Sequence, residues 1–346
     1  MEKDIKLLSQ EELVAYLVAN KFPKFHAKQI FTWLYQRGVD DFSSMSDISQ
    51  GLRKQLESDF YLSKVVVKNR AVSNDKTRKY LFGLEDANTI ESVLIPHKDG
   101  RNTICLSSQV GCKFACKFCA SGMAGFVRNL TQAEILNQVL FIKKDTKDRI
   151  SNIVFMGIGE PLDNYEVVLS SIRILNLKEG FGIGQRKITI SSAGFIDGIS
   201  KLAREGMQIE LSISLHSAID EKRSTIMPIN IKYPLSKLLP CLKEFARLTK
   251  RKITFEYMLL GGFNTDINDM QALVKIAKSL DCKVNLIPFN AVENAGFMPP
   301  TKLEALYARD FLLKNDIDTT IRVARGQDIK AACGQLRLSE IDNKNI

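Results

Sequence analysis

The chain has 346 residues, and 45% of them are apolar, the usual share for a globular protein. This length and composition exclude a disordered chain, a collagen-like chain and a small disulfide-rich protein. The formal charge of +10 favours an anionic partner without identifying it. Seven cysteines and an N-terminus without the apolar core of a signal peptide predict a reducing, cytoplasmic location. No apolar run is long enough to predict a membrane-spanning helix.

The excess positive charge is concentrated in two stretches. The segment from Lys64 to Lys79 holds six basic residues against Asp75 alone, and residues 101–150 hold eight basic and three acidic residues. A surface that meets phosphates needs such a concentration of charge. A solvated lysine face is an equally weighted alternative.

Residues 1–63 predict a small helical domain. Ser9 followed by Glu12 has the spacing of a capping box, and an amphipathic helix runs from His26 to a stop at Gly38. Residues 64–100 predict a short β-rich extension that links this domain to the rest, because strand-like runs at 65–69, 78–84 and 89–96 alternate with turn residues.

From residue 101 to 336 strand patterns alternate with helical patterns. The predicted strands cover 103–108, 152–157, 187–192, 209–216, 252–259, 283–289 and 319–324, and the first helix between them starts with a capping box from Thr131 to Glu134. This alternation predicts an α/β domain with a parallel sheet, either open or curled into a full or partial barrel. In both cases chemistry gathers at the C-terminal ends of the strands. Residues 337–346 are expected to form a flexible tail.

Three cysteines lie within eight residues, directly after the first of these strands: Cys112, Cys116 and Cys119. Three nearby thiolates suit zinc, copper(I) or an iron–sulfur cluster, and a chance cluster of buried thiols is the plain alternative. A structural zinc site takes four ligands, usually as two separated pairs, and no second pair follows here. Three cysteines holding a cubane would leave one iron open to a ligand.

This C-x3-C-x2-C pattern, with Phe118 before the last cysteine, resembles that of the radical S-adenosylmethionine superfamily. The segments CLSSQVGC (105–112), FMGIGEPL (155–162), ISLH (213–216), VNLIPFN (284–290) and AACGQL (331–336) are similar to those of the RlmN/Cfr family of RNA methyltransferases. The resemblance implies a partial (βα)6-type barrel and a 4Fe-4S cluster held by the three cysteines. It also implies two molecules of S-adenosylmethionine per turnover and an RNA-binding role for residues 1–63.

A set of polar and small residues at strand ends is predicted to bind S-adenosylmethionine. A dinucleotide-binding interpretation of Gly157-Ile-Gly159 fails, because the third glycine would fall at Leu162. Glycine allows a ligand to approach the backbone, and a carboxylate such as that of Glu160 can accept hydrogen bonds from an ammonium group. By resemblance the site comprises Gly159, Glu160, Ser191, Ser214, Leu215, His216 and Asn290.

Cys333 and Cys105 would, as an isolated pair, be interpreted as inert buried thiols. The resemblance implies instead that Cys333 is methylated, that a 5′-deoxyadenosyl radical removes hydrogen from this S-methyl group, and that the carbon radical adds to the RNA base. Cys105 then attacks the sulfur of Cys333 and a transient disulfide releases the product. Glu91 matches the proton acceptor.

The family resemblance implies C2 of adenosine as the target, in 23S rRNA and at position 37 of tRNA. The alternative is C8, the target of the Cfr branch that confers resistance to ribosome antibiotics; Val110, where that branch has a cysteine, favours C2. We expect a monomer, no membrane partner, and an electron donor such as flavodoxin or ferredoxin. Two rival functions are a radical enzyme acting on a small molecule and an RNA-binding protein with a structural zinc.

Five other residues receive plainer interpretations. Cys241 and Cys282 have no partner motif and are expected to be structural. Lys222, Arg223 and Arg325 are interpreted either as RNA phosphate contacts or as solvated charges.

Overall fold

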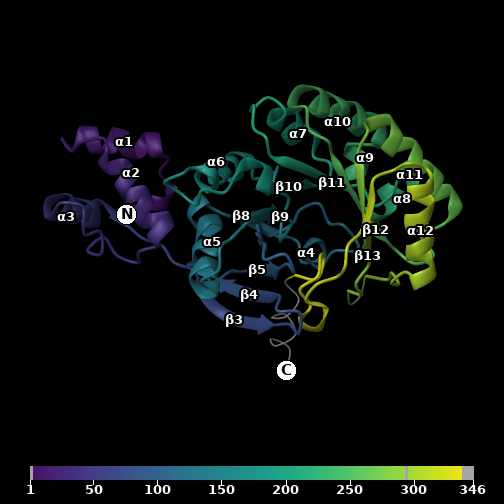
Figure 1. The fold of residues 1–346 in the computed structure, drawn as a ribbon, viewed down its shortest axis with the longest axis horizontal. Helices are drawn as coiled ribbons and strands as arrows, with labels where there is room; N and C mark the ends of the chain where they lie inside the picture. Colours follow the sequence, from purple (N-terminus) through teal and green to yellow (C-terminus); the bar gives the residue numbers. More distant parts are fainter. Residues whose placement is uncertain (1–2, 293–294, 337–346) are drawn as a thin grey trace.

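The computed structural model describes residues 3–292 and 295–336, and its centre is a ten-stranded sheet (Figure 1). The sheet order is β14-β13-β12-β11-β10-β9-β6-β5-β4-β3. Seven strands run parallel and form the barrel part: β6 (Asn102–Cys105), β9 (Asn152–Phe155), β10 (Ile188–Ser192), β11 (Glu210–Ser214), β12 (Thr254–Leu259), β13 (Lys283–Pro288) and β14 (Thr319–Ile321). All seven predicted strands are therefore present. The predicted tail, 337–346, lies outside the described residues.

Helices between these strands cover the outer face of the sheet, as the alternating pattern predicts (Figure 1). They are α5 (Gln132–Thr146), α6 (Tyr165–Asn176), α7 (Ile196–Leu202), α8 (Asp220–Ile226), α9 (Ile229–Lys232), α10 (Leu235–Thr249), α11 (Ile267–Leu280) and α12 (Lys302–Lys314). The capping box from Thr131 to Glu134 forms at the start of α5. Residues of the strands from β6 to β13 line one cavity, so the sheet curls, and it keeps two edges; the predicted partial barrel is confirmed.

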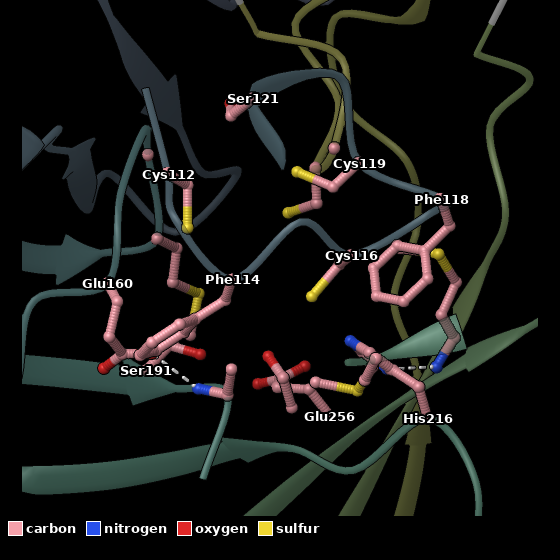
Figure 2. Close-up of a pocket in the computed structure, with 18 of the residues that line it drawn as sticks. Cys112, Phe114, Cys116, Phe118, Cys119, Ser121, Glu160, Ser191, His216 and Glu256 are labelled. Carbon is pink, nitrogen blue, oxygen red and sulfur yellow. Dashed lines mark hydrogen bonds between the residues drawn. The ribbon is translucent and has the colours of Figure 1, made fainter. Parts of the chain in front are cut away.

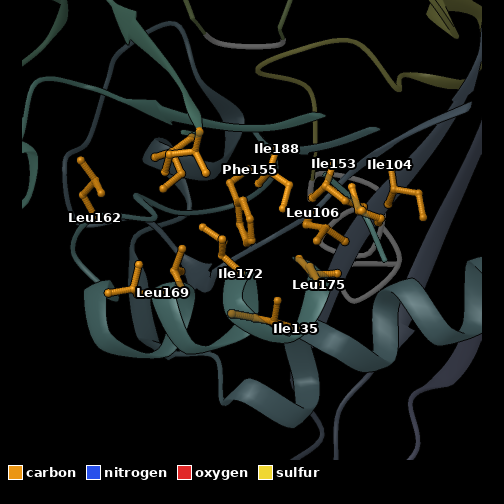
Figure 3. Close-up of a cluster of buried hydrophobic side chains, with 14 of the residues drawn as sticks. Ile104, Leu106, Ile135, Ile153, Phe155, Leu162, Leu169, Ile172, Leu175 and Ile188 are labelled. Atoms are coloured by element: carbon orange, nitrogen blue, oxygen red, sulfur yellow. The ribbon is translucent and has the colours of Figure 1, made fainter. Parts of the chain in front are cut away.

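The core lies between the sheet and these helices. Figure 3 shows Ile104, Ile153 and Phe155 of the strands facing Ile172 and Leu175 of α6, and all five side chains are buried. Each side chain of this size contributes roughly 1.5–3 kcal/mol when it leaves water. This core fixes the strand ends on which the site is built.

The β-rich extension is part of the main sheet. Strands β3 (Val66–Val72), β4 (Arg78–Gly83) and β5 (Thr89–Pro96) run antiparallel, and β5 pairs with β6, so that Val93 lies opposite Cys105. The strands and their antiparallel arrangement were predicted as an extension between two domains; their pairing with the main sheet was not predicted. Their backbone hydrogen bonds extend the sheet beside the first barrel strand.

The N-terminal region contains α1 (Gln10–Ala19), α2 (His26–Phe31), a π-helix (Thr32–Arg37) and α3 (Gln50–Asp59). The capping box at Ser9 and the left-handed stop at Gly38 both form as predicted. Two short strands, β1 (Lys3–Asp4) and β2 (Phe60–Tyr61), pair in parallel beside the helices. The side-chain ammonium of Lys6 ties this region to α5, donating to Asn137 Oδ1 at 2.7 Å.

A small hairpin frames the cysteine loop. It consists of β7 (Gln109–Gly111) and β8 (Phe126–Asn129), with the short helix α4 (Ala120–Met123) between the cysteines and β8. The sequence pattern did not predict these three elements. Among the described residues, no helix is long and apolar enough to cross a membrane.

Candidate active site

The three clustered cysteines lie on a loop over the C-terminal ends of the barrel strands. Backbone hydrogen bonds hold the loop: Cys112 N–H donates to the Gly125 carbonyl at 2.8 Å, and Cys119 N–H donates to the Cys116 carbonyl at 3.1 Å. All three cysteines line one cavity, and Figure 2 shows the loop above it with Glu160 and His216 on opposite sides below. The structure thus brings the predicted metal ligands together over the predicted cofactor residues.

Most of the predicted cofactor residues share this cavity, and two do not. Leu215 is fully buried in the main hydrophobic core and is absent from the described cavity lining. Asn290 lines a neighbouring cavity, where its Oδ1 accepts from Gln327 Nε2 at 2.7 Å. The residues that do line the main cavity are Gly159, Glu160, Ser191, Ser214 and His216.

Glu160 is almost completely buried, and backbone groups fix its carboxylate. Its Oε2 accepts from Ala193 N–H at 2.8 Å and its Oε1 from Leu162 N–H at 3.1 Å. Burial raises the pKa of Glu160 to about 7, although these hydrogen bonds oppose the shift. A buried carboxylate facing a cavity is stabilised by a cationic ligand, so Glu160 is suited to bind an ammonium group.

Gly159 is a cavity residue at a position where only glycine fits. Its φ is +103°, and a Cβ atom there would lie 2.5 Å from Gln109 Cβ. The close approach lets the Gln109 side chain accept a hydrogen bond from Glu160 N–H at 2.8 Å. The glycine therefore sets the position of the carboxylate that follows it.

His216 is buried and neutral. Its Nδ1 accepts from Met258 N–H at 3.0 Å, so its proton is on Nε2, and its ring packs edge-on against Phe118 at 4.8 Å between centroids. Burial lowers the pKa of His216 to about 3, with a smaller contribution from Arg223. The imidazole thus joins the cysteine loop to the strand ends without adding charge.

Cys333 lines both the main cavity and a second one, which it shares with Cys105. Its segment is held beside the cysteine loop, because Ala120 N–H donates to the Gly334 carbonyl at 2.7 Å. Cys105 ends β6, and burial raises its pKa to about 12, with a further contribution from the Cys333 thiol. The structure therefore brings the two predicted catalytic thiols to one cavity.

Glu91 lies on β5 and is completely buried. Its carboxylate Oε1 lies 3.1 Å from the ammonium of Lys79 on β4. Val93, two residues further along the strand on the same face, lines the cavity that holds both thiols. Glu91 is thus close to this cavity in the sheet but is not part of its described lining.

Two charged residues in the cavity wall escaped the sequence analysis. Glu256 is buried on β12, accepts from Asn285 Nδ2 at 2.7 Å, and has its pKa raised by burial. Arg322 lines both cavities and its pKa is raised, first by Cys333 and then by Glu256 and Cys105. Each is a charged residue within a predicted strand that is otherwise largely apolar, Glu256 in FEYMLL and Arg322 in TTIRVA, and this pattern could have indicated their role.

Both interpretations considered for Arg223 are wrong, because its side chain is neither solvated nor exposed to RNA. It is fully buried and its guanidinium donates to the carbonyls of Ala193, Ser214 and Leu215 at 2.7 to 3.1 Å. Lys222 is also engaged, since its ammonium lies 2.8 Å from the Asp269 carboxylate. Both residues support the framework around the cavity.

The residues present fit an iron–sulfur cluster. Three cysteines face one cavity with the apolar rings of Phe114 and Phe118, and soft thiolates in an apolar setting are what such a cluster requires. In the described part of the chain, no three His, Cys, Asp or Glu side chains are arranged around a single metal ion. Each thiolate of a cubane binds its own iron, so the sulfurs need only face the same space.

Comparisons with known proteins show which families the chain is similar to. Residues 4–62 match the ribosomal RNA large subunit methyltransferase N-terminal domain, and residues 106–275 match the radical SAM superfamily. The probable dual-specificity RNA methyltransferase RlmN of Clostridium novyi is 44% identical over 99% of both chains. The dual-specificity RNA methyltransferase RlmN of Pelobacter propionicus is 42% identical over 96% of this chain and 95% of that protein. A crystal structure of a radical SAM methyltransferase from Sphaerobacter thermophilus, 37% identical, matches with a TM-score of 0.91 over 97% of this chain and 99% of that one.

Proposed function

This chain belongs to the RlmN family of radical S-adenosylmethionine RNA methyltransferases, and from that premise we propose that it methylates C2 of adenosine. The proposed targets are an adenosine of the peptidyl transferase centre in 23S rRNA and adenosine 37 of tRNA. The observation that carries the proposal is Cys333, whose side chain lines both the cavity of the three clustered cysteines and the cavity of Cys105.

Cys112, Cys116 and Cys119 would hold the 4Fe-4S cluster, and Glu160 would bind the ammonium group of S-adenosylmethionine. When bound, these cofactors supply a methyl group and, after reduction by a donor such as flavodoxin or ferredoxin, a 5′-deoxyadenosyl radical. Two molecules of S-adenosylmethionine are consumed per turnover in this scheme. The apolar rings of Phe114 and Phe118 would keep water away from the reactive centre.

Cys333 carries the methyl group in the proposed cycle and becomes joined through its carbon to the RNA base. Cys105 loses its proton and attacks the sulfur of Cys333, so that an S–S bond forms and the bond from sulfur to the base-linked carbon breaks. The electron pair of that bond stays on the carbon, which takes up a proton and becomes the methyl group, while Glu91 takes the proton from the substrate carbon. A cellular thiol reductant then returns the disulfide of Cys105 and Cys333 to two thiols. Burial raises the pKa of Cys105 to about 12, so the thiol is neutral at pH 7 and has to lose its proton before it attacks. Arg322 is the charged side chain suited to stabilise the thiolate that attacks.

The choice of C2 over C8 is supported by Val110, a buried residue of β7 that stands where the C8 branch has a cysteine. RNA as the substrate is supported by the exposed lysines of the basic segment, Lys64, Lys68 and Lys76. Arg70 and Arg78 of the same segment instead pair with the Asp145 carboxylate, at 2.5 and 2.9 Å. Relatives that match 99% of the chain are named RNA methyltransferases, so the small-molecule and zinc-protein alternatives lose their support.

The decisive experiment is nucleoside mass spectrometry of RNA treated with the anaerobically reconstituted protein, S-adenosylmethionine and a reductant. We expect 2-methyladenosine in both a 23S rRNA fragment and a tRNA. Formation of 8-methyladenosine would replace the proposal with the C8 alternative. Absence of any methylated adenosine from a protein that loads its cluster would refute it. Gel filtration of the same sample tests the expectation of a monomer.

A further inference from the structure

Lys79 is a lysine in an unusual place. It lies on β4 with its residue only 9% exposed, and its ammonium is 3.1 Å from the Glu91 carboxylate, whose side chain is 1% exposed. Lysine and glutamate are almost never buried in proteins unless they are paired, because leaving water is costly for both charges. The surrounding structure has to compensate for the cost of burying both charges. The position of the pair relative to the two thiols suggests a role that justifies this cost.

The strand register places this pair on the same side of the sheet as Cys105. Lys79 is opposite Val93 on the neighbouring strand β5, and Val93 is opposite Cys105 on β6. Residues directly opposite each other in antiparallel strands have side chains on the same face. Glu91 is two residues from Val93 and shares that face. Lys79, Glu91 and Cys105 therefore lie on one face of three adjacent strands, with Val93 between Lys79 and Cys105.

The ammonium of Lys79 also contacts the segment that carries Cys333. It donates to the Lys330 carbonyl at 3.3 Å, three residues before the catalytic thiol. The turn just before Lys79 holds the same segment: Asp75 Oδ2 accepts from Gly326 N–H at 3.2 Å, and Ser73 Oγ donates to Asp328 Oδ1 at 2.5 Å. One charged group thus contacts both the predicted proton acceptor and the segment of the predicted methyl carrier.

We infer that Lys79 is a positioning residue, which fixes the Glu91 carboxylate relative to the segment of Cys333 while the adduct is resolved. The inference rests on the proposed function, since it assigns Lys79 to the proton-transfer step of that cycle. Two physical effects follow from the contact. The ammonium orients the carboxylate, and its opposite charge offsets part of the cost of burying that carboxylate. Without Lys79, the Glu91 carboxylate would remain buried but would lose the positive charge next to it.

The test uses the full-length, cluster-loaded protein and measures the decay of the covalent protein–RNA adduct in single turnover. In Lys79→Met we expect decay to slow by about tenfold or more at pH 7, a part of the roughly 10²–10⁴-fold that general base catalysis contributes.

Three further variants make the result specific. Lys79→Arg should restore most of the decay rate, because it keeps the charge. In Glu91→Gln, adding Lys79→Met should cause no further slowing. Lys252→Met is the matched control. Lys252 is also ion-paired, at 2.8 Å from Asp281, but its side chain is 58% exposed and it stands just before the start of β12, whereas Cys105 is at the end of β6, so decay should match wild type. Iron content and 5′-deoxyadenosine formation should be unchanged in the single variants of Lys79 and Lys252.

Decay of the Lys79→Met adduct at the wild-type rate would overturn the inference. If Lys79→Met does not fold, Lys79→Gln, which keeps a donor for the Lys330 carbonyl, is measured in the same way. Misfolding of both, with Lys79→Arg indistinguishable from wild type, would assign Lys79 to stability and also overturn it. The proposed function fails separately, if the wild-type protein forms no 2-methyladenosine and Cys105→Ala traps no adduct.

Discussion

Replacing Arg223 with methionine should destabilise the protein strongly and disorder one wall of the cavity. The guanidinium donates to four buried acceptors, the carbonyls of Ala193, Ser214 and Leu215 and the Oδ1 of Asn230, at distances between 2.6 and 3.1 Å. Each unsatisfied buried acceptor costs about 1–3 kcal/mol. Local relaxation and water entry recover part of this, so we expect a loss of about 3–5 kcal/mol in the free energy of unfolding.

The assay is urea unfolding of the cluster-free protein, followed by circular dichroism. The control is Arg247→Met on α10, which removes a solvent-exposed pair with Glu244 at 2.7 Å and should leave the urea midpoint unchanged. Arg223→Lys should give an intermediate midpoint, because an ammonium cannot reach all four acceptors from one position. An Arg223→Met protein within about 1 kcal/mol of wild type would refute the reasoning that these hydrogen bonds hold the strand ends.

Four other outcomes follow from the site. Cys105→Ala should accumulate a covalent protein–RNA adduct through Cys333, visible on a denaturing gel; free RNA after incubation with S-adenosylmethionine and reductant would contradict this. Gly159→Ala should weaken S-adenosylmethionine binding at least about tenfold, as measured by calorimetry, because the added Cβ would lie 2.5 Å from Gln109 Cβ. The control is Gly51→Ala, where the added Cβ would have no atom within 4 Å, and this variant should bind S-adenosylmethionine normally. His216 has a pKa of about 3 in the folded state and about 6.5 in the unfolded state, so only the unfolded state gains this proton as the pH falls. The free energy of unfolding should therefore decline below about pH 6.5, and it should decline less in His216→Gln. An equal decline in both proteins would contradict a buried, neutral His216. Anaerobic protein should contain about four irons per chain, and Cys116→Ala should lose most of them by elemental analysis.

The features that the sequence predicted correctly are those that depend on residues close together in the chain. The capping boxes at Ser9 and Thr131 each need only four residues to be recognised, and both form. The barrel strands were predicted from runs of apolar residues, and the cysteine cluster from its spacing. These features depend on near neighbours in the chain, so a single sequence contains their signal.

The features that escaped prediction depend on pairing between distant segments. The attachment of β5 to β6 turns the extension into part of the main sheet, and neither strand's pattern indicates its neighbour. The hairpin of β7 and β8 is too short to show alternation. Glu256 and Arg322 face the cavity because of the strand register, and Arg223 is buried because three strand-end carbonyls converge on it. A one-residue shift in register would reverse the face that each strand residue presents.

The buried contact between Lys6 and α5 fixes the N-terminal region relative to the barrel. Lys6, Asn137 and Ser63 form hydrogen bonds of 2.7 Å inside a core that continues without interruption from α1 to the barrel. The N-terminal region and the barrel should therefore melt in one transition and move as one body. An RNA that contacts both parts would have to match a fixed distance between them. The three-dimensional shape of the RNA, and not only its local sequence, would then decide which adenosine reaches Cys333.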